Sequence, residues 1–341
     1  MRALIFKQPG PIETVELGQL PLPTPGKGQV RIKLTSAGLN RADTLFPEER
    51  YFYKPEFSSY LSSEPGSASH YCRLGFEGAG IIDEVGPEVD YNVGDRVAII
   101  PLALDVCRQG CFAEYGIYDA SSLIHTPQSL SDEKAGAVWM QYLTAWAGLA
   151  IDGNLKRGQS VVITAASSSV GIAAIQVANM LGAITIATTT SNDKVERLKQ
   201  FGAQHVINMK SEDYVQKIAS ITSGKGTDLV FDAVAGPDTR YLVQGSAKGG
   251  KIIIQGMLDK RPMDIHAGVL MKRLLTVKGF TLDIVLDNPT LLKCAIDQIT
   301  KGINDQQLEP VVAQTFALPD FKDAFSLLKS NKHTGKIIIT P

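Results

Sequence analysis

Residues 164–171, with the sequence TAASSSVG, combine hydroxyl side chains with one glycine in a pattern that could bind phosphate. They follow the apolar stretch SVVI and precede an apolar stretch of helical spacing, where a dinucleotide site carries its phosphate-binding loop. Backbone N–H groups and the N-terminus of the helix hold the phosphate in such a loop. Ser167, Ser168 and Ser169 supply these N–H groups and add hydroxyl donors, so we predict a pyrophosphate site here.

Glycine is scarce in this loop, because Gly171 is the only one of the eight residues that is glycine. Glycines usually allow a tight turn, close approach of the backbone to the pyrophosphate and close packing of the helix on the strand. Serine can replace glycine wherever the backbone does not need a positive φ. We expect Gly171 to serve the helix packing. The alternative is an ordinary polar turn that binds nothing.

The stretch ATTTSNDK, residues 187–194, follows the next predicted strand and bears on the choice between NADPH and NADH. An acidic residue at the end of that strand would accept hydrogen bonds from the ribose 2′-hydroxyl and would repel a 2′-phosphate. This chain offers the hydroxyl donors Thr188, Thr190 and Ser191 instead. We interpret Asp193 as a first-turn acid that complements the helix dipole. The pattern favours NADPH.

The elements that position these residues alternate between strand and helix from about residue 129 to 285. Predicted strands are SVVIT, ITIAT, HVIN, DLVFDAV, KIIIQG and LLTVKGF, and predicted helices begin near Val170, Asp193 and Tyr214. Such alternation is typical of a doubly wound parallel sheet, so we predict an α/β Rossmann domain over 129–285. A helical stretch that starts with Ser131, at about residues 131–150, lies at the beginning of this domain and precedes its first strand.

Residues 1–128 have a different texture, with short β-rich stretches separated by Gly and Pro, which predicts a barrel-like β domain. Residues 286–341 contain two helical stretches and two strand-like ones. Because so few elements cannot form a core alone, we expect this tail to pack on the first domain. The 341-residue length agrees with two domains.

Composition limits the partners of the chain. Hydrophobic residues make up 44% and charged residues 20%, and the net charge is −1, which gives no reason to expect binding to nucleic acid or to an acidic membrane. The uncharged run 158–192 could suggest a membrane span, but its polar residues and changing period argue against one. The N-terminus does not resemble a secretory signal. We therefore expect a cytoplasmic protein that acts on a small molecule.

The four cysteines, Cys72, Cys107, Cys111 and Cys294, have no spacing typical of a disulfide framework. We expect separate reduced thiols, as in a cytosolic protein. The alternative is that Cys72 approaches Cys107 and Cys111 in space. A structural zinc ion needs four N or S ligands, whereas Cys107 and Cys111 are only a pair and the five histidines are scattered. The sequence therefore predicts no metal site.

Several motifs in order, GFEGAGIIDEVG, VGDRVA, FAEY, TAASSSVGIAAIQVANMLGA and TGKIII, resemble the medium-chain dehydrogenase/reductase superfamily. The chain is most similar to the zinc-independent quinone oxidoreductase branch, related to zeta-crystallin. The resemblance implies that a GroES-like β-rich domain and the C-terminal tail form a catalytic domain, and that the active site lies in the cleft between it and the Rossmann domain. Phe76 stands where zinc-dependent members have a histidine, beside Glu77, which again implies no zinc.

The resemblance also implies site residues. Asn40, Asp43 and Tyr51 are expected at the substrate end as catalytic residues, with Asn40 and Tyr51 as hydrogen-bond donors and Asp43 orienting Asn40 or a water. Alternatively, Asn40 and Asp43 only cap a helix and Tyr51 is a loop aromatic. The implied cofactor-binding set is Thr144, Ser167, Ser168, Ser169, Val170, Gly171, Thr188, Thr190, Ser191, Lys194, Gly236 and Gly256. Lys194 matches a family lysine that approaches the 2′-phosphate.

The function that this resemblance implies is an NADPH-dependent reductase of quinones or of the activated C=C bond of α,β-unsaturated carbonyl compounds. A zinc-free site suits such acceptors, because only their oxygen must be polarised and later protonated. The alternatives are an NADPH-binding protein without turnover and an alcohol dehydrogenase. The segment 57–72 could be a lid or a disordered insertion. The predicted strand at 274–282 should lie at a sheet edge, which favours a homodimer.

Overall fold

The structure is a computed structural model, and it describes residues 1–57 and 71–341. The chain divides into two compact units, each of which is described by itself. Unit 1 comprises Met1–Met140 together with Pro310–Pro341, and unit 2 comprises Gln141–Glu309. The boundaries expected from sequence were 128/129 and 285/286. The expected lid or insertion at 57–72 lies mostly outside the described residues.

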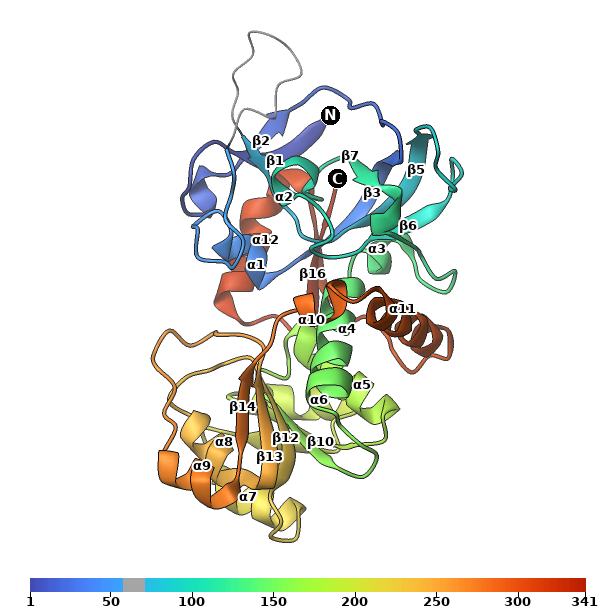
Figure 1. The fold of residues 1–341 in the computed structure, drawn as a ribbon. Coiled ribbons are helices and arrows are strands. Elements are labelled where there is room, and N and C mark those ends of the chain that lie inside the picture. Colours follow the sequence, from blue (N-terminus) through green and yellow to red (C-terminus); the bar gives the residue numbers. More distant parts are fainter. Residues whose placement is uncertain (58–70) are drawn as a thin grey trace. The chain divides into compact units, whose positions relative to one another are not determined.

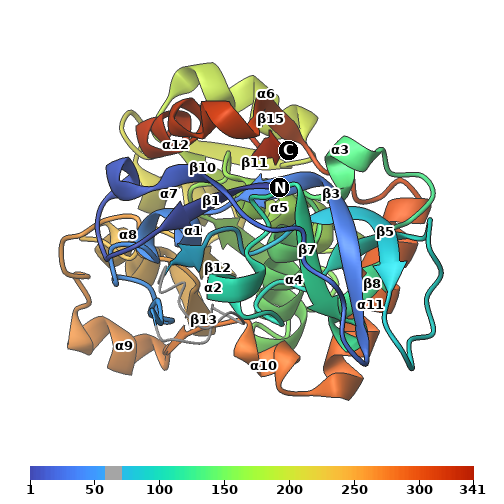
Figure 2. The same ribbon diagram turned by 90° about the horizontal axis from the view of Figure 1, so that it is seen from above.

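Unit 1 is built on two sheets (Figures 1 and 2). A three-stranded sheet has the order β2-β1-β4, and a second sheet has the order β15-β16-β3-β5-β6-β8, with β7 pairing β3. The strands are β1 (Arg2–Phe6), β2 (Glu16–Gln19), β3 (Gln29–Leu39), β4 (Cys72–Arg73), β5 (Ala79–Val85), β6 (Arg96–Ile99), β7 (Tyr115–Asp119), β8 (Leu123–His125), β15 (Val312–Ala317) and β16 (Lys336–Thr340).

The long strand β3 organises the second sheet. Its residues Val30, Ile32 and Leu34 are buried while Lys33 between them is exposed, which is the alternation of a strand with one face on a core. The C-terminal strand β16 pairs with β3 in antiparallel register, with Ile338 opposite Gly38. The last residues of the chain therefore lie beside the strand that leads to Asn40.

Short helices complete unit 1. They are α1 (Arg41–Leu45), α2 (Val106–Gln109), α3 (Asp132–Ala135) and α12 (Phe321–Ser330), with 3-10 turns at Ile12–Thr14, Ala120–Ser122 and Leu318–Asp320. The continuous helix expected after Ser131 is interrupted after α3 and resumes as α4 (Trp139–Trp146). Gly136 causes the break: its N–H donates to Ser36 Oγ at 3.0 Å, and a Cβ there would lie 2.6 Å from Ser36 O.

Unit 2 contains a six-stranded parallel sheet with the order β11-β10-β9-β12-β13-β14. Its strands are β9 (Ser160–Ile163), β10 (Ile184–Thr189), β11 (His205–Asn208), β12 (Thr227–Asp232), β13 (Ser246–Ile254) and β14 (Thr276–Gly279). Its helices are most of α4, a π-helical stretch η4 (Ala147–Asp152), α5 (Ser169–Met180), η5 (Asn192–Lys194), α6 (Val195–Gln200), α7 (Tyr214–Ile221), α8 (Thr239–Gly245), α9 (Ala267–Arg273), α10 (Asp283–Leu286) and α11 (Pro289–Asn304). The predicted fold class, a Rossmann sheet plus a GroES-like β-rich domain, is confirmed.

Both faces of this sheet are covered, as the continuously apolar strands predict. Helices α7, α8 and α9 pack on one face, where Val162, Ile186, Val230 and Ile252 form a buried cluster. The alternate side chains of β12 point to the other face, where Gly148 of η4 packs on the Phe231 ring. Helix α5 also packs against η4 and β9, which places the start of α5 at the carboxyl end of β9.

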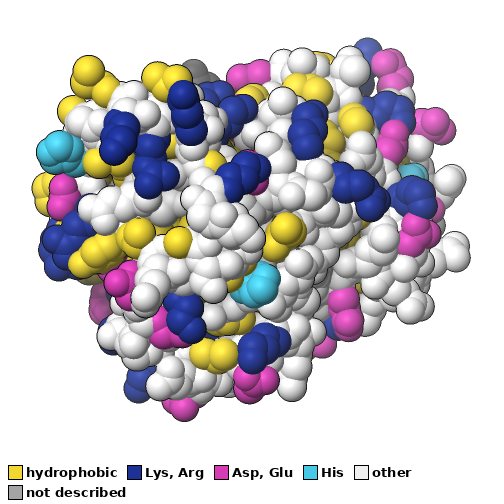
Figure 3. Space-filling view, turned by 90° about the horizontal axis from the view of Figure 1, so that it is seen from below, with side chains coloured by type: hydrophobic (Ala, Val, Ile, Leu, Met, Phe, Trp, Pro, Cys, Tyr) yellow, Lys and Arg dark blue, Asp and Glu magenta, His cyan; other side chains and the backbone are white. Residues whose placement is uncertain are grey.

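The described residues contain no helix long and apolar enough to cross a membrane. On the face drawn in Figure 3, Lys and Arg side chains are interspersed with Asp and Glu, in keeping with the near-zero net charge.

Candidate functional site

The serine loop of unit 2 runs directly into α5. Ser168 is the N-cap residue, with its Oγ accepting a hydrogen bond from the Gly171 N–H at 3.1 Å. The N–H groups of a first helical turn have no partner within the helix, so those of Ser169 and Val170 point out of the N-terminus. The Ser168 hydroxyl can still donate its own hydrogen. The loop thus presents donors for an anion where the helix dipole is positive.

Close packing at the start of α5 explains why residue 171 is glycine. A Cβ at Gly171 would lie 2.7 Å from Ala165 O and from Ala166 Cα, so only glycine fits where α5 begins. Of residues 164–171, all of which the structure describes, Ala165 alone has a positive φ, of 44°. The serines therefore adopt their backbone conformations without strain. The strain of a positive φ in a residue other than glycine falls on Ala165.

Lys194 reaches the serine loop from η5. Its Nζ donates a hydrogen bond to Ser167 Oγ at 3.0 Å, and burial lowers the pKa of the ammonium. Thr188 is buried at the end of β10, Thr190 is exposed, and the Ser191 N–H donates to Thr189 Oγ1 at 3.2 Å. The residues predicted for the phosphate loop and for the ribose end therefore meet through Lys194 and Ser167.

Gly236 and Gly256 follow β12 and β13, and the structure brings their turns together. A Cβ at Gly256 would lie 2.9 Å from Ala233 O, and a Cβ at Gly236 would lie 2.5 Å from Asp259 Oδ2. Both turns lie at the carboxyl ends of the parallel strands, as does the serine loop. Thr144, on α4, is buried within unit 2.

Asp232 is a residue of this edge that sequence reasoning missed. It ends β12, is fully buried, and accepts hydrogen bonds from Thr164 Oγ1 at 2.6 Å and from the backbone N–H groups of Val234 and Ala235. It therefore ties the strand before the serine loop to the turn that contains Gly236. The signal was a carboxylate at the end of a predicted buried strand.

Unit 1 contains a buried polar cluster formed by Asn40, Asp43, Glu77 and Lys336. Lys336, on β16, pairs with Glu77 Oε1 and donates a second hydrogen bond to Asn40 Oδ1 at 2.6 Å. The two charged side chains are only 1% and 2% exposed. The other Glu77 oxygen accepts the Met140 N–H at 2.9 Å, at the start of α4. Glu77 is thus held from three sides.

The amide of Asn40 is fully used inside the cluster. Its Nδ2 donates to Gly38 O at 3.0 Å and to Glu77 Oε1 at 3.1 Å, which accounts for both amide hydrogens. The predicted role of Asn40 as a donor to substrate therefore has to be revised, because it has no hydrogen left to donate. Its backbone N–H donates to Asp43 Oδ2 at 2.7 Å at the start of α1, which agrees with the capping alternative.

Gly38 makes room for this cluster. A Cβ at Gly38 would lie 2.5 Å from both Glu77 Oε1 and Lys336 Cε, and 2.6 Å from Gly136 O. A side chain at position 38 would therefore displace the ion pair between Lys336 and Glu77. Lys336 was missed from the sequence, although a lysine inside the apolar stretch GKIIIT is unusual, because lysine is almost never fully buried unless it is paired.

Tyr51 lies close to the cluster through the fully buried Phe76. The Tyr51 ring packs on the Phe76 ring with centroids 5.3 Å apart, and the Phe46 ring packs edge-on against Phe76 at 5.4 Å. Phe76 is adjacent to Glu77 in the chain. The Phe76 ring therefore contacts both Tyr51 and Phe46, the C-cap residue of α1. Through Glu77, its neighbour in the chain, Phe76 is also joined to the buried cluster.

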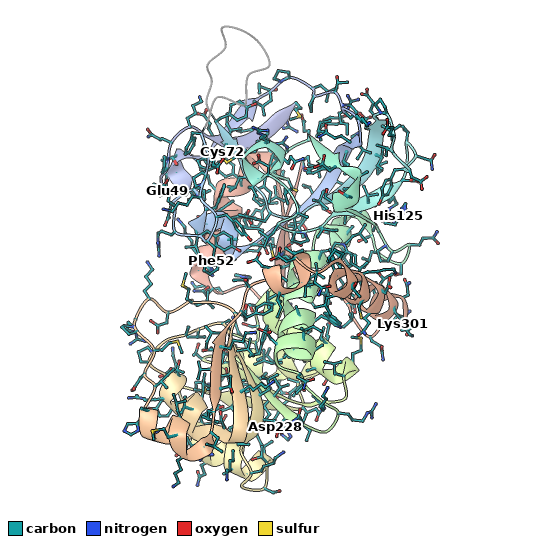
Figure 4. The ribbon with its side chains drawn as sticks, in the orientation of Figure 1. Glu49, Phe52, Cys72, His125, Asp228 and Lys301 are labelled. Carbon is teal, nitrogen blue, oxygen red and sulfur yellow. A yellow bond between two sulfur atoms is a disulfide. The ribbon has the colours of Figure 1, made fainter. Side chains whose placement is uncertain are left out.

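The cysteines differ from expectation. Cys72, on β4, forms a disulfide with Cys107, on α2, and Cys72 is labelled in Figure 4. The expectation of four separate thiols is therefore wrong: β4 and α2, which lie 35 residues apart in sequence, bring these two together. The Glu56 N–H lies 3.4 Å from Cys107 Sγ and its carbonyl oxygen 3.4 Å from Cys72 Sγ. Cys111 and Cys294 are free.

Phe76, which the resemblance puts where zinc-dependent members have a histidine, contributes a buried ring without a ligand atom. Within residues 1–57 and 71–341, no group of three or more His, Cys, Asp or Glu side chains is arranged to hold a metal ion.

Comparisons with known proteins agree with this architecture. One family model, an alcohol dehydrogenase GroES-like domain, matches residues 26–128, and another, a zinc-binding dehydrogenase, matches residues 169–297. The Escherichia coli quinone oxidoreductase complexed with NADPH has a similar structure, with a TM-score of 0.86, 25% identity and full coverage of both chains.

Curated relatives extend the match to nearly the whole chain. A phenolphthiocerol/phthiocerol polyketide synthase polypeptide of Mycobacterium tuberculosis is 30% identical over 342 residues, 99% of this chain, but the chain spans only 15% of that protein's length. The quinone oxidoreductase-like protein 2 homolog of Nematostella vectensis is 30% identical over 319 residues, covering 92% of this chain and 82% of that protein. The chain therefore belongs to the medium-chain dehydrogenase/reductase superfamily, among its quinone oxidoreductase-like members.

Proposed function

We propose that the protein is an NADPH-dependent reductase that transfers hydride to a quinone or to the activated C=C bond of an α,β-unsaturated carbonyl compound. The observation that carries the proposal is the serine loop at the N-terminus of α5 with the Lys194 ammonium 3.0 Å from Ser167. The loop provides hydrogen-bond donors for the pyrophosphate of the cofactor. The Lys194 ammonium, next to Ser167, provides a cation for its 2′-phosphate. The E. coli quinone oxidoreductase complexed with NADPH supports the same cofactor.

The residues of unit 2 fit a dinucleotide phosphate. Gly171 lets the backbone of α5 begin against Ala165 and Ala166, and the Ser168 cap accepts the Gly171 N–H, which leaves the N–H groups of Ser169 and Val170 at the N-terminus for an anion. Lys194 is in place to pair with a 2′-phosphate, since its ammonium lies at the loop that presents the phosphate donors. NADPH, when bound, would supply the hydride, and the residues of this chain bind and orient it.

The acceptor needs a hydrogen-bond donor for the oxygen that gains negative charge. In the proposed catalytic set, the phenol hydroxyl of Tyr51 is a group that can donate to this oxygen, whereas both amide hydrogens of Asn40 are used within the cluster. Its half-buried ring is held against Phe76, so the hydroxyl is carried on a fixed support. Conjugated acceptors suit this arrangement, because one donor to oxygen assists hydride transfer to a carbon of the conjugated system.

The experiment that tests this proposal mixes purified protein and NADPH with 1,4-naphthoquinone, methyl vinyl ketone or a simple acrylate ester and follows the loss of NADPH absorbance. We expect protein-dependent loss with at least one quinone or enone. Binding of NADPH without turnover of any of them would favour the alternative of a non-catalytic NADPH-binding protein. Oxidation of a simple alcohol with NADP⁺ would favour an alcohol dehydrogenase instead.

A further inference from the structure

The buried cluster of unit 1 has unequal charges. It contains two carboxyl groups, Asp43 and Glu77, and one ammonium, Lys336. Lys336 pairs with Glu77, whose oxygens also accept hydrogen bonds from Asn40 and from the Met140 N–H. Glu77 and Lys336 therefore compensate each other. Within the described part of the chain, Asp43 has no ion pair.

Asp43 is fully buried in this setting. Its Oδ2 accepts the Asn40 N–H at 2.7 Å, whereas its Oδ1 has no hydrogen-bond partner among residues 1–57 and 71–341. An ionised carboxylate in such a place is costly unless it is paired. Burial accordingly raises the pKa of Asp43 from 3.8 to about 7, against the lowering effects of the Asn40 N–H and of Lys336. The group therefore changes charge near neutral pH.

A packed path leads from Asp43 to Tyr51. The hydrogen bond from Asn40 fixes the start of α1, and Phe46 follows the end of that helix. The Phe46 ring meets Phe76 edge-on, and the Tyr51 ring packs on Phe76 as well. Phe46 and Phe76 therefore connect the start of α1 to the ring that supports Tyr51.

We propose that Asp43 is a positioning residue for the acceptor site, and that its charge state, tuned in opposite directions by Lys336 and Glu77, decides how firmly Tyr51 is held. The inference rests on the proposed function. The ionised carboxylate accepts a charge-assisted hydrogen bond from Asn40, which is shorter and stronger than that of the neutral acid. The ionised state therefore makes the stronger hydrogen bond at the start of α1, although burial makes it the costlier state for the fold as a whole, and turnover rises with pH through the titration of Asp43.

The charged groups near Asp43 determine in which direction each substitution should shift the pKa of its carboxyl group. Lys336 on β16 lowers the pKa of Asp43, and Glu77, in the turn before β5, raises it. The Cys111 thiol is also near, but burial raises its pKa to about 12, so it stays neutral over the range of interest. Lys336→Met should move the pH midpoint of turnover upward, and Glu77→Gln should move it downward. General destabilisation cannot produce shifts of opposite sign.

The first experiment measures kcat/KM for NADPH-dependent reduction of 1,4-naphthoquinone against pH. The wild type should show a rise centred near pH 7. Asp43→Asn, which keeps an oxygen acceptor for the Asn40 N–H, should remove that rise, and Lys336→Arg, which keeps the charge, should leave the midpoint unchanged. In the Tyr51→Phe background the pH step should shrink, because Asp43 acts through Tyr51. Equal midpoints in Lys336→Met and Glu77→Gln would overturn the proposal.

The second experiment needs no activity and uses the free energy of unfolding. Because the folded pKa of Asp43 is raised, its contribution to stability is fully present below about pH 3.8 and is lost as pH rises to about 7. The difference in stability between wild type and Asp43→Asn should therefore change across that window. A constant difference would overturn the inference, whereas a changing difference without turnover of any acceptor would overturn only the proposed function.

The single variants Lys336→Met and Glu77→Gln should be much less stable than the wild type, because removing one partner of a buried ion pair is strongly destabilising. The double variant Lys336→Met/Glu77→Gln removes both charges of the ion pair, so neither of these two positions keeps a buried charge without its partner. Since the two effects on Asp43 oppose each other, its pH midpoint should lie between those of the single variants and close to that of the wild type. A midpoint outside that interval would contradict the proposal even if the single variants do not fold.

Discussion

The Lys194 ammonium donates a hydrogen bond to the Ser167 hydroxyl at 3.0 Å, so the end of the second strand of the Rossmann sheet meets the loop after the first. Lys194→Gln should weaken NADPH binding about tenfold or more, since a hydrogen bond to a charged group contributes about 1.5–3 kcal/mol. NADH affinity should change little. Lys199→Gln on α6, which removes only an exposed ion pair with Glu196, is the matched control. Equal losses for both cofactors would place the 2′-phosphate elsewhere.

Tyr51→Phe tests the donor to the acceptor oxygen. Loss of one preorganised donor lowers the rate by roughly a hundredfold in comparable sites. We expect a loss approaching that size with an enone, a smaller loss with a quinone, which accepts hydride more readily, and little change in NADPH affinity. Tyr53→Phe, two residues along the same segment, serves as the control. Small, equal losses with both acceptors would return Tyr51 to the role of a loop aromatic.

The disulfide between Cys72 and Cys107 predicts a thiol count. The denatured protein should react with two equivalents of a thiol reagent before reduction, from Cys111 and Cys294, and with four after it. Reduction should lower stability by about 4 kcal/mol, because the bond closes a loop of 35 residues. Cys72→Ser should abolish the effect of reductant and Cys294→Ser should not. Four reactive thiols without reductant would contradict the disulfide.

Strand β14 predicts how copies of this chain associate. It is the last strand of the six-stranded sheet, pairs with β13 among the described strands, and follows the exposed side chains Met271 and Leu274. A sheet edge of this kind favours pairing with another copy unless it is covered. Light scattering at micromolar concentration should give twice the mass of one chain, and Met271→Asp should reduce it while Leu22→Asp in unit 1 does not. A monomer mass for the wild type would refute the dimer.

The Rossmann unit could be predicted in detail because its signals are local. The range of α7 follows from the helical spacing of YVQKIASI, and β9 and β10 follow from apolar runs bounded by turns. The break after α3 could not be predicted, because it depends on the contact between Gly136 and Ser36, one hundred residues apart. Local periodicity contains no information about such a contact.

The same distinction between local signals and long-range contacts applies to the candidate site. The serine loop and its helix are one continuous segment, so their relation was visible in the sequence. The link between Lys336 and Asn40 joins residues 296 positions apart, and it determines which way the Asn40 amide faces. Asn40 was therefore expected to donate to substrate, although its hydrogens are used within the cluster. The disulfide was missed for the same reason, since only the packing of α2 on β4 brings its sulfurs together.

Single-turnover mixing of the protein, NADPH and 1,4-naphthoquinone in the absence of oxygen tests the central claim most directly. We expect that NADPH is oxidised in step with reduction of the quinone, one hydride for each acceptor molecule, in an amount that follows the amount of protein-bound NADPH, and that Lys194→Gln slows the reaction at limiting NADPH. NADPH that binds but is not consumed with this quinone or with any enone would contradict it.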